Sequence, residues 1–502
     1  MSSQQCGLQP MNMIRNALTA LLLSTTGPVS AVHLDPDGRG QVLIFPYYST
    51  AGDTQTLLSV VNHRDSGKAV KLRVREARNG REVATLNLYL GEFDVWTAAL
   101  FTAPDGTPAL LTDDHSCTVP AVDTSSSLPR LPDGRPYLPF SNAEFIGPRS
   151  DGGPTELSRL ATGYIEVIEM GSLIDHSNSD RYATPVNGVP FSCQSLVAAW
   201  SAEQAGYWRA DPTTDLSPPL GGLSGSLSLL RVGEGTAWEI PVSAIDAFSV
   251  IMQHTAPDSR TPDLASAVTE PAQTSVESNV LAAGRLVRSR WPQSRAIDAV
   301  SAVLSQETIR AEYTEETTIG ARTDWVLSMP TRRFYNDPAI TAIALVPFTV
   351  LSDQPQRCEV VRPTSYNREG ARPVGAIGFG GVIEPGTCIC DAVQLLPVGG
   401  VADPAAPAAA LCQRNPLPTV HPGAHLDAGF YELQMAGGGR RTRPALDGET
   451  YEGLPILGFT LQSYRNAAAR PGEIGIYSSA RRQSGDVRCR RGSADCAPLP
   501  FD

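Results

Sequence analysis

Hydrophobic and polar residues alternate through the first hundred residues of the chain. Between positions 70 and 75, valine and leucine alternate with lysine and arginine, and between positions 86 and 90 leucine alternates with polar residues or tyrosine. This period of two is typical of strands with one buried and one solvent-exposed face. Asn79 and Gly80 lie between the two runs and suit a hairpin turn, because both tolerate a positive φ. The segment 41–102 therefore predicts an antiparallel meander of strands.

Strand-like runs continue toward the C-terminal part of the chain, with two helical interruptions. Apolar residues recur at helical spacing in 192–207 and from 294 to 313, where Ser294 suits an N-cap. The later predicted strands are residues 164–170, 221–232, 325–329, 340–350, 392–397, 429–435 and 454–463. The predicted fold class is mainly β, with two antiparallel β-sandwich-like units and a few short helices.

Composition suggests where the chain divides. Residues 255–275 are rich in proline, threonine, serine and alanine, a composition that buries little and usually links units. The predicted organisation is a signal peptide (1–31), an N-terminal β-sandwich-like domain (32–254), a linker (255–275), a helical connector (276–320), a C-terminal β-sandwich-like domain (321–480) and a basic C-terminal tail (481–502).

The first residues indicate export. Arg15 precedes an apolar run at 17–23, and the small residues Val29, Ser30 and Ala31 follow. A signal peptidase requires small residues at such a site, so cleavage is predicted between Ala31 and Val32. No later stretch reaches the roughly 20 apolar residues of a membrane-spanning helix. We therefore expect a protein of the periplasm, the cell surface or the extracellular space, without a transmembrane segment in the mature chain.

Cysteine usage supports an oxidising compartment. Cys6 would leave with the signal peptide, and the remaining eight are Cys117, Cys193, Cys358, Cys388, Cys390, Cys412, Cys489 and Cys496. An even number suits complete pairing. Proximity favours Cys117 with Cys193 and Cys489 with Cys496, and leaves the middle four to pair among themselves. The alternative is a zinc site at Cys388 and Cys390, but a zinc ribbon would need a second cysteine arm.

The net charge and the motif content argue against several classes of function. The net charge of −12 argues against nucleic-acid binding, which needs a basic surface to displace phosphate counterions. Neither a dinucleotide-binding G-x-G-x-x-G nor a phosphate-binding P-loop is present, so no cofactor is expected. The arginine-rich residues 481–491 could dock on anionic envelope material. The alternative for this segment is a solvated tail.

Motifs for nucleophilic or zinc-dependent hydrolysis are incomplete. Ser224 follows Gly222 and Leu223, but the final glycine of G-x-S-x-G is missing and the residues suit a strand. His421 and His425 have the spacing of zinc ligands on one helical face. The proline and glycine between them disfavour a helix, so both are interpreted as surface-loop residues.

Two groups of ionisable residues are candidates for a metal site or for acid–base catalysis. Asp113, Asp114 and His115 lie just before Cys117, but a half-disulfide cysteine cannot ligate a metal as thiolate, which favours a hairpin loop. The carboxylates at positions 166 and 169 fall on opposite faces of a strand because their separation is odd. They therefore cannot act together as an acid and a base, although a glycosidase could recruit a second carboxylate from elsewhere.

Several aromatic strings span most of the mature chain. They are residues 43–48 (LIFPYY), 56–62 (TLLSVVN), 87–98 (NLYLGEFDVWTA), 163–171 (GYIEVIEMG), 323–335 (TDWVLSMPTRRFY) and 453–459 (GLPILGF). With these strings the chain resembles an uncharacterised family of exported Gram-negative bacterial proteins. The resemblance implies export and brings no catalytic residues.

The sequence favours a binding or envelope-structural protein over an enzyme. Export, disulfides and a β-rich pattern accompany an absence of catalytic motifs, and the ligand is an unknown envelope or extracellular molecule. The alternative is a secreted hydrolase acting on glycans, with carboxylates that converge only in the fold. A buried cleft with two carboxylates of raised pKa would favour that alternative.

Overall fold

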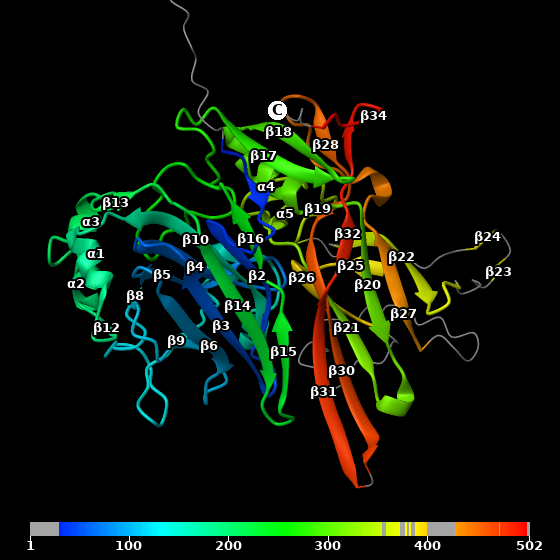
Figure 1. The fold of residues 1–502 in the computed structure, drawn as a ribbon, viewed down its shortest axis with the longest axis horizontal. Coiled ribbons are helices and arrows are strands. Elements are labelled where there is room, and N and C mark those ends of the chain that lie inside the picture. The colour runs from blue at the N-terminus through cyan, green and yellow to red at the C-terminus, as the bar shows by residue number, and fades with distance from the viewer. Residues whose placement is uncertain are drawn as a thin grey trace, which may run out of the picture.

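The computed structural model describes residues 30–353, 358–371, 377–378, 381–382, 387–398, 427–470 and 472–498. Strands account for 45% of the structure and helices for 12%, so the protein is mainly β as predicted. Figure 1 shows two groups of sheets side by side, with few helices between and beside them. Within the described ranges, no helix is both long and apolar enough to cross a membrane. Most of the predicted signal peptide, Cys412, His421 and His425 lie outside the described residues.

The N-terminal half is a sandwich of two antiparallel sheets. The eight-stranded sheet has the order β1 (His33–Leu34), β16 (Ser243–Asp246), β2 (Val42–Ser49), β10 (Thr162–Leu173), β4 (Lys68–Glu76), β5 (Glu82–Leu90) and β8 (Cys117–Val119), with β13 (Leu216–Ser217) beside β10. The six-stranded sheet has the order β15 (Thr236–Ile240), β14 (Leu223–Arg231), β3 (Thr54–Asn62), β6 (Val95–Thr102), β7 (Pro108–Leu111) and β9 (Leu138–Pro139). The inward residues of both sheets, such as Val60, Leu72 and Leu227, form one apolar core.

The C-terminal half contains two larger sheets and several small ones. A five-stranded sheet has the order β25 (Thr387–Ile389), β22 (Glu359–Asn367), β27 (Ala428–Gln434), β20 (Thr308–Thr314) and β32 (Ser484–Asp486), and a four-stranded sheet the order β26 (Val393–Pro397), β21 (Arg322–Ser328), β30 (Leu457–Arg470) and β31 (Glu473–Arg482). The smaller sheets are β17 (Ser275–Ala282) with β18 (Arg285–Pro292), β19 (Ser305–Gln306) with β29 (Leu454–Pro455), β23 (Ile377–Gly378) with β24 (Gly381–Val382), and β28 (Glu449–Tyr451) with β33 (Cys489–Arg491) and β34 (Ala494–Asp495). Short 3-10 helices are η1 (Ala143–Phe145), η2 (Gly147–Arg149), η3 (Leu157–Ala161), η4 (Gln293–Arg295), η5 (Thr317–Ile319) and η6 (Gly437–Gly439).

Strand β21 of the four-stranded sheet is buried on both faces and joins the two halves. Trp325 and Leu327 of β21 belong to the core beside the five-stranded sheet. Val326, between them, packs with Phe459 into the core of the N-terminal sandwich. Because successive residues of a strand point to opposite faces, an uninterrupted apolar run such as that of β21 indicates burial on both sides. The two halves therefore share their apolar cores.

The chain between the halves differs from the predicted helical connector. Residues 275–292 form the β17–β18 hairpin, and the helix α4 (Ala296–Leu304) ends before the strand β20. The turn between β17 and β18 holds Ala283 and Gly284 at positive φ, and alternate residues of β17 are buried, so a hairpin pattern was present in the sequence. The strand predicted at 340–350 is also wrong, because these residues form turns and bends in which Ile343 is exposed.

The prediction of a solvent-exposed face on β4 is wrong as well. Lys71, Arg73 and Arg75 are at most 1% exposed. Residues 254–263 lie across them, and Lys71 Nζ donates to the Ala256 carbonyl oxygen at 2.7 Å. This covering segment falls partly within the predicted linker, where Leu264 and Ala267 are also fully buried. The polar face of the strand is therefore covered by the polar backbone of a distant segment.

A buried ion cluster joins the two halves at one end of β4. Arg159 donates to Glu76 from Nε at 3.1 Å and to Asp151 from Nη2 at 2.5 Å. Arg81 donates to Asp337 at 2.8 Å, directly after the short helix α5 (Arg333–Asn336) of the C-terminal half. All five side chains are at most 9% exposed. The cluster attaches residues 331–337, which include the TRRFY string, to the N-terminal sandwich.

Residues 481–498 of the predicted basic tail are not a free tail. Residues 481–495 complete β31 and form β32, β33 and β34, and the disulfide Cys489–Cys496 closes the final turn. Four arginines of this segment lie in ion pairs, namely Arg481 with Glu312, Arg488 with Glu307, Arg490 with Asp495 and Arg491 with Glu449. Pairing with acidic neighbours in the sheet explains why the segment is ordered despite its charge.

Candidate functional site

A cleft of about 510 Å³ lies against the outer face of the eight-stranded sheet. One wall is a helical insert between β10 and β13, and the other is the chain segment 254–259. This cleft, called the tryptophan cleft below, is lined by Trp200, Trp208, Arg209, Pro212, His254, Thr255, Ala256, Pro257, Asp258 and Ser259. Its volume lies in the range of roughly 300–1,000 Å³ that is typical of ligand pockets.

The helical insert is held in place by local caps. It contains α1 (Asn178–Ala183), α2 (Cys193–Ala198), α3 (Tyr207–Ala210) and the hairpin β11 (Pro185–Val186) with β12 (Val189–Pro190), beside β8 and β13 in Figure 1. The hydroxyls of Ser177 and Ser192 accept hydrogen bonds from the first turns of α1 and α2. The helix predicted over 192–207 is shorter in the structure, because α2 ends at Ala198 and α3 begins only at Tyr207.

A disulfide fastens the insert to the sheet. Cys117 at the start of β8 pairs with Cys193 at the start of α2, as proximity favoured. Replacing both cysteines by serine should lower the free energy of unfolding by about 2–4 kcal/mol, because the bond closes a loop across 76 residues. Hydrogen exchange should increase mainly in residues 174–215, measured by mass spectrometry. The matched control replaces Cys489 and Cys496, only 7 residues apart, and a larger effect there would contradict this account.

The remaining cysteines are consistent with an oxidised chain. Cys358 pairs with Cys390, within the middle group as expected. Cys388 is unpaired among the described residues, and Cys412 lies outside them. The three disulfides are typical of proteins from oxidising compartments.

A hydrogen-bond network forms the floor of the tryptophan cleft. Trp200 Nε1 donates to the Tyr89 hydroxyl at 2.9 Å, and Asn87 Nδ2 donates to the same oxygen at 3.3 Å. His254 contacts Tyr89 through Nε2 at 3.0 Å and the Pro212 carbonyl oxygen through Nδ1 at 2.7 Å. A carbonyl oxygen only accepts, so His254 Nδ1 carries the proton and Nε2 accepts from Tyr89. The Tyr89 hydroxyl and both ring nitrogens of His254 then have partners, whereas Asn87 Oδ1 has none among the described residues.

Burial keeps His254 neutral. Burial lowers the pKa of His254 to about 3, and the nearby Lys71 ammonium adds to this effect. Burial also raises the pKa of Tyr89, so the phenol stays protonated. The Trp208 ring lies 4.9 Å from the Tyr89 ring in a stacked arrangement and 4.7 Å from the His254 ring. His254 is therefore a structural residue whose lone pair is occupied, and it is unsuited to act as a general base.

Buried cations hold the second wall. Lys71 Nζ donates to the carbonyl oxygens of Ala256 and Pro257 at 2.7 and 3.2 Å. Arg73 Nη2 donates to the Ser259 carbonyl oxygen at 2.7 Å and also pairs with Glu82. Burial and the neighbouring Arg73 lower the pKa of Lys71 to about 7. The segment that lines the cleft is thus anchored to the sheet through its backbone.

The cleft combines aromatic surface with a polar rim. The indole ring of Trp208 is fully buried, whereas Trp200 is partly exposed. Arg209 and Asp258 are exposed at the rim and offer a hydrogen-bond donor and an acceptor of opposite charge. Asp258 is the one carboxylate that lines the cleft. The arrangement can stack against a ring and bind its polar edge, but it lacks the pair of carboxylates that glycoside hydrolysis requires.

The ionisable groups considered from sequence lie elsewhere. Glu166 pairs with Arg75 and Glu169 with Lys68, each at 2.7 Å. In the strand register, Glu166 lies opposite Arg73 on the covered face and Glu169 opposite Val70 on the core face, so the two carboxylates do face opposite ways.

The aspartates before Cys117 belong to a loop. Asp113 pairs with Arg135 at 2.9 Å, and Asp114 accepts a hydrogen bond from the Ser116 hydroxyl at 2.7 Å. Cys117 is in a disulfide. The residues lie in a loop as predicted, but it is not a hairpin loop, because β7 and β8 belong to different sheets.

Ser224 has a histidine partner that the sequence motif did not reveal. His63 Nε2 lies 2.7 Å from Ser224 Oγ, although the residues are 161 positions apart. Among the described residues, no carboxylate contacts His63, so the orienting group of a catalytic triad is missing. The pair lies on an exposed strand face outside the tryptophan cleft.

The fold also brings together Asp175, His176 and Asp180. The side-chain atoms that could bind a metal ion lie within 4.8 Å of one another. Asp175 and His176 are exposed, and Asp180 also accepts a hydrogen bond from the His176 backbone. Exposed acidic groups of this kind are common on protein surfaces, and this one supports no assignment.

Comparisons with known proteins do not extend this description. The chain matches no family model, no curated protein and no solved structure. The function is therefore argued from the geometry of the tryptophan cleft.

Proposed function

We propose that the protein is an exported binding protein and that its tryptophan cleft binds a saccharide. The observation that carries the proposal is the convergence of Trp200 and Trp208 on one cleft whose rim holds Arg209 and Asp258. A sugar ring has an apolar face of C–H groups and a polar edge of hydroxyls. The partly exposed indole ring of Trp200, backed by the buried Trp208, suits that face, and the rim residues suit that edge.

Export belongs to the same proposal. Three disulfides and the predicted signal peptide support a location in the periplasm, at the cell surface or outside the cell. Glycans are abundant in all three places. A disulfide-braced cleft on a rigid sheet also suits a ligand that is recognised without a large conformational change.

Binding is favoured over hydrolysis by the carboxylate content of the cleft. A glycosidase needs an acid and a second carboxylate about 5–9.5 Å apart. Asp258 has no second carboxylate beside it in the lining, and His254 Nε2 is occupied by Tyr89. The hydrolase alternative would place the chemistry at a site other than this cleft.

The test is a glycan array followed by calorimetry with the best saccharide. Trp200→Ala should weaken binding at least tenfold, because the variant removes one stacking surface at the more exposed side of the cleft. Trp200→Phe is the matched control, since it keeps an aromatic face but loses the N–H group that donates to Tyr89. Mass spectrometry of the saccharide after incubation should show it intact. No binding, or equal affinity of wild type and Trp200→Ala, would refute the proposal, and cleavage products would favour the hydrolase.

A further inference from the structure

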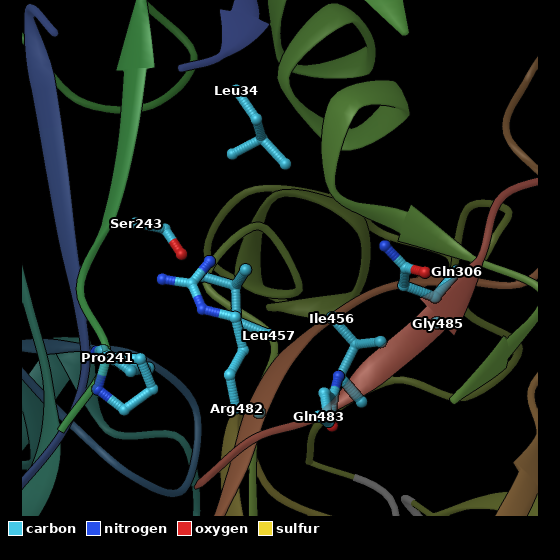
Figure 2. Close-up of a pocket in the computed structure, with 11 residues that line it drawn as sticks. Leu34, Pro241, Ser243, Gln306, Ile456, Leu457, Arg482, Gln483 and Gly485 are labelled. Carbon is cyan, nitrogen blue, oxygen red and sulfur yellow. The ribbon is translucent and has the colours of Figure 1, made fainter. Parts of the chain in front are cut away.

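A second cavity, of about 110 Å³, lies between the two halves of the molecule. We call it the interface pocket. Ser243 at the start of β16 contributes to it from the N-terminal half, and Gln306 of β19 and Arg482 at the end of β31 contribute from the C-terminal half. Figure 2 shows the Arg482 guanidinium and the Ser243 hydroxyl turned toward each other, with Gln306 across the opening.

Three polar side chains of the interface pocket can each offer a hydrogen-bond donor. Gln306 Oε1 lies against Gly485 and has no hydrogen-bond partner among the described residues. Figure 2 shows the Gln306 amide nitrogen on the cavity side. Arg482 donates one hydrogen bond, at 2.9 Å, to the Val242 carbonyl oxygen, and a guanidinium has five N–H groups. The Ser243 hydroxyl can donate a third.

Arg482 also differs from its neighbours in charge compensation. The other arginines of the C-terminal segment, Arg481, Arg488, Arg490 and Arg491, each pair with a carboxylate. Within the described part of the chain, no carboxylate lies at ion-pair distance from Arg482. Arg482 is exposed to solvent at the edge of the pocket, where its unpaired positive charge is accessible to an anion.

We propose that the interface pocket binds a small carboxylate with a short aliphatic chain. Its carboxylate accepts hydrogen bonds from Arg482, Gln306 and Ser243, and its chain lies against Leu34 and Ile456, which line the same cavity. Arginine is the side chain best shaped to bind a carboxylate through two parallel hydrogen bonds. A phosphate dianion fits less well, because the pocket offers one cation and roughly half of its lining is apolar. The cavity holds a ligand of only a few heavy atoms.

A ligand in this position contacts both halves, so it binds the native state and stabilises it. Thermal unfolding of the full mature chain is measured in sodium butyrate, sodium phosphate and sodium chloride at equal ionic strength. We expect butyrate to raise the Tm by about 2–4 °C over chloride at saturating concentration, and phosphate to add little. Calorimetry with butyrate should give an affinity at least tenfold weaker for Arg482→Gln.

Arg481→Gln is the matched control, because Arg481 pairs with Glu312 and does not line the pocket. It should bind butyrate like the wild type. Gln306→Leu provides a second pocket variant and should also weaken binding. Equal effects of butyrate and chloride on the wild type, or equal affinity in Arg482→Gln, would refute the site. A larger stabilisation by phosphate than by butyrate would refute the carboxylate assignment.

Discussion

Lowering the pH from 6.5 to about 3 should destabilise the protein strongly through His254. Burial lowers the pKa of this imidazole from 6.5 to about 3 in the folded state. Because the folded pKa lies below the unfolded one, the unfolded state binds the proton more tightly. The stability associated with neutral His254 is therefore complete above pH 6.5 and is lost as the pH falls toward 3. At about 1.4 kcal/mol per pKa unit, the loss reaches roughly 4–5 kcal/mol.

The variant His254→Gln isolates this contribution. Glutamine can replace both hydrogen bonds but does not titrate, so the variant should be less stable at pH 7.5 by about 1–3 kcal/mol. The difference should shrink or reverse as the pH approaches 4, measured by urea denaturation at several pH values. Titration of Lys71 does not contribute between pH 4 and 6, because the pKa of Lys71 is lowered only to about 7. His176, whose side chain is 91% exposed, provides the control His176→Gln. Parallel curves for wild type and His254→Gln would contradict the expectation.

Replacing Arg159 by methionine should cost about 3–5 kcal/mol of unfolding free energy. Arg159 binds both Glu76 and Asp151, and both carboxylates are at most 5% exposed. Removal of the cation would leave buried Glu76 without its ion pair and Asp151 with only the more distant Arg81, at 3.8 Å, and such a loss is strongly destabilising. Burial would raise the pKa of Asp151, but hydrogen bonds and charge from Arg159 hold it well below its usual range. The pKa of Asp151 should therefore rise in the variant.

The control for Arg159→Met is Arg135→Met. Arg135 also pairs with two aspartates, Asp113 at 2.9 Å and Asp133 at 2.8 Å, but its side chain is 44% exposed. Exposed pairs contribute about 0–1 kcal/mol, so this variant should lose little stability. Both are measured by chemical denaturation at pH 7. Similar losses for the two variants would show that burial of the cluster between the halves does not determine its strength.

Local patterns in the sequence were sufficient for much of the fold. The predicted meander contains the strands β2 to β6, and the predicted strands near 164–170 and 429–435 lie within or overlap β10 and β27. Period-two alternation and turn residues depend on only a few neighbouring residues. Strands and hairpins form over the same short range, so these patterns predict them. Cysteine proximity likewise favoured Cys117 with Cys193, and the structure contains that disulfide.

The sequence therefore determined a mainly β, disulfide-containing chain and the position of most strands, because these properties depend on neighbouring residues. Only the tertiary structure decided the sites. The backbone of Ala256, 185 positions away, covers Lys71. The alternation in β4 indicated a solvent-exposed polar face, but that face is therefore buried. Tyr89 and Trp200 are 111 positions apart. Arg482, which lines the interface pocket, is 240 positions from its hydrogen-bond partner Val242. Contacts over such distances depend on how sheets pack, and no local pattern encodes that packing.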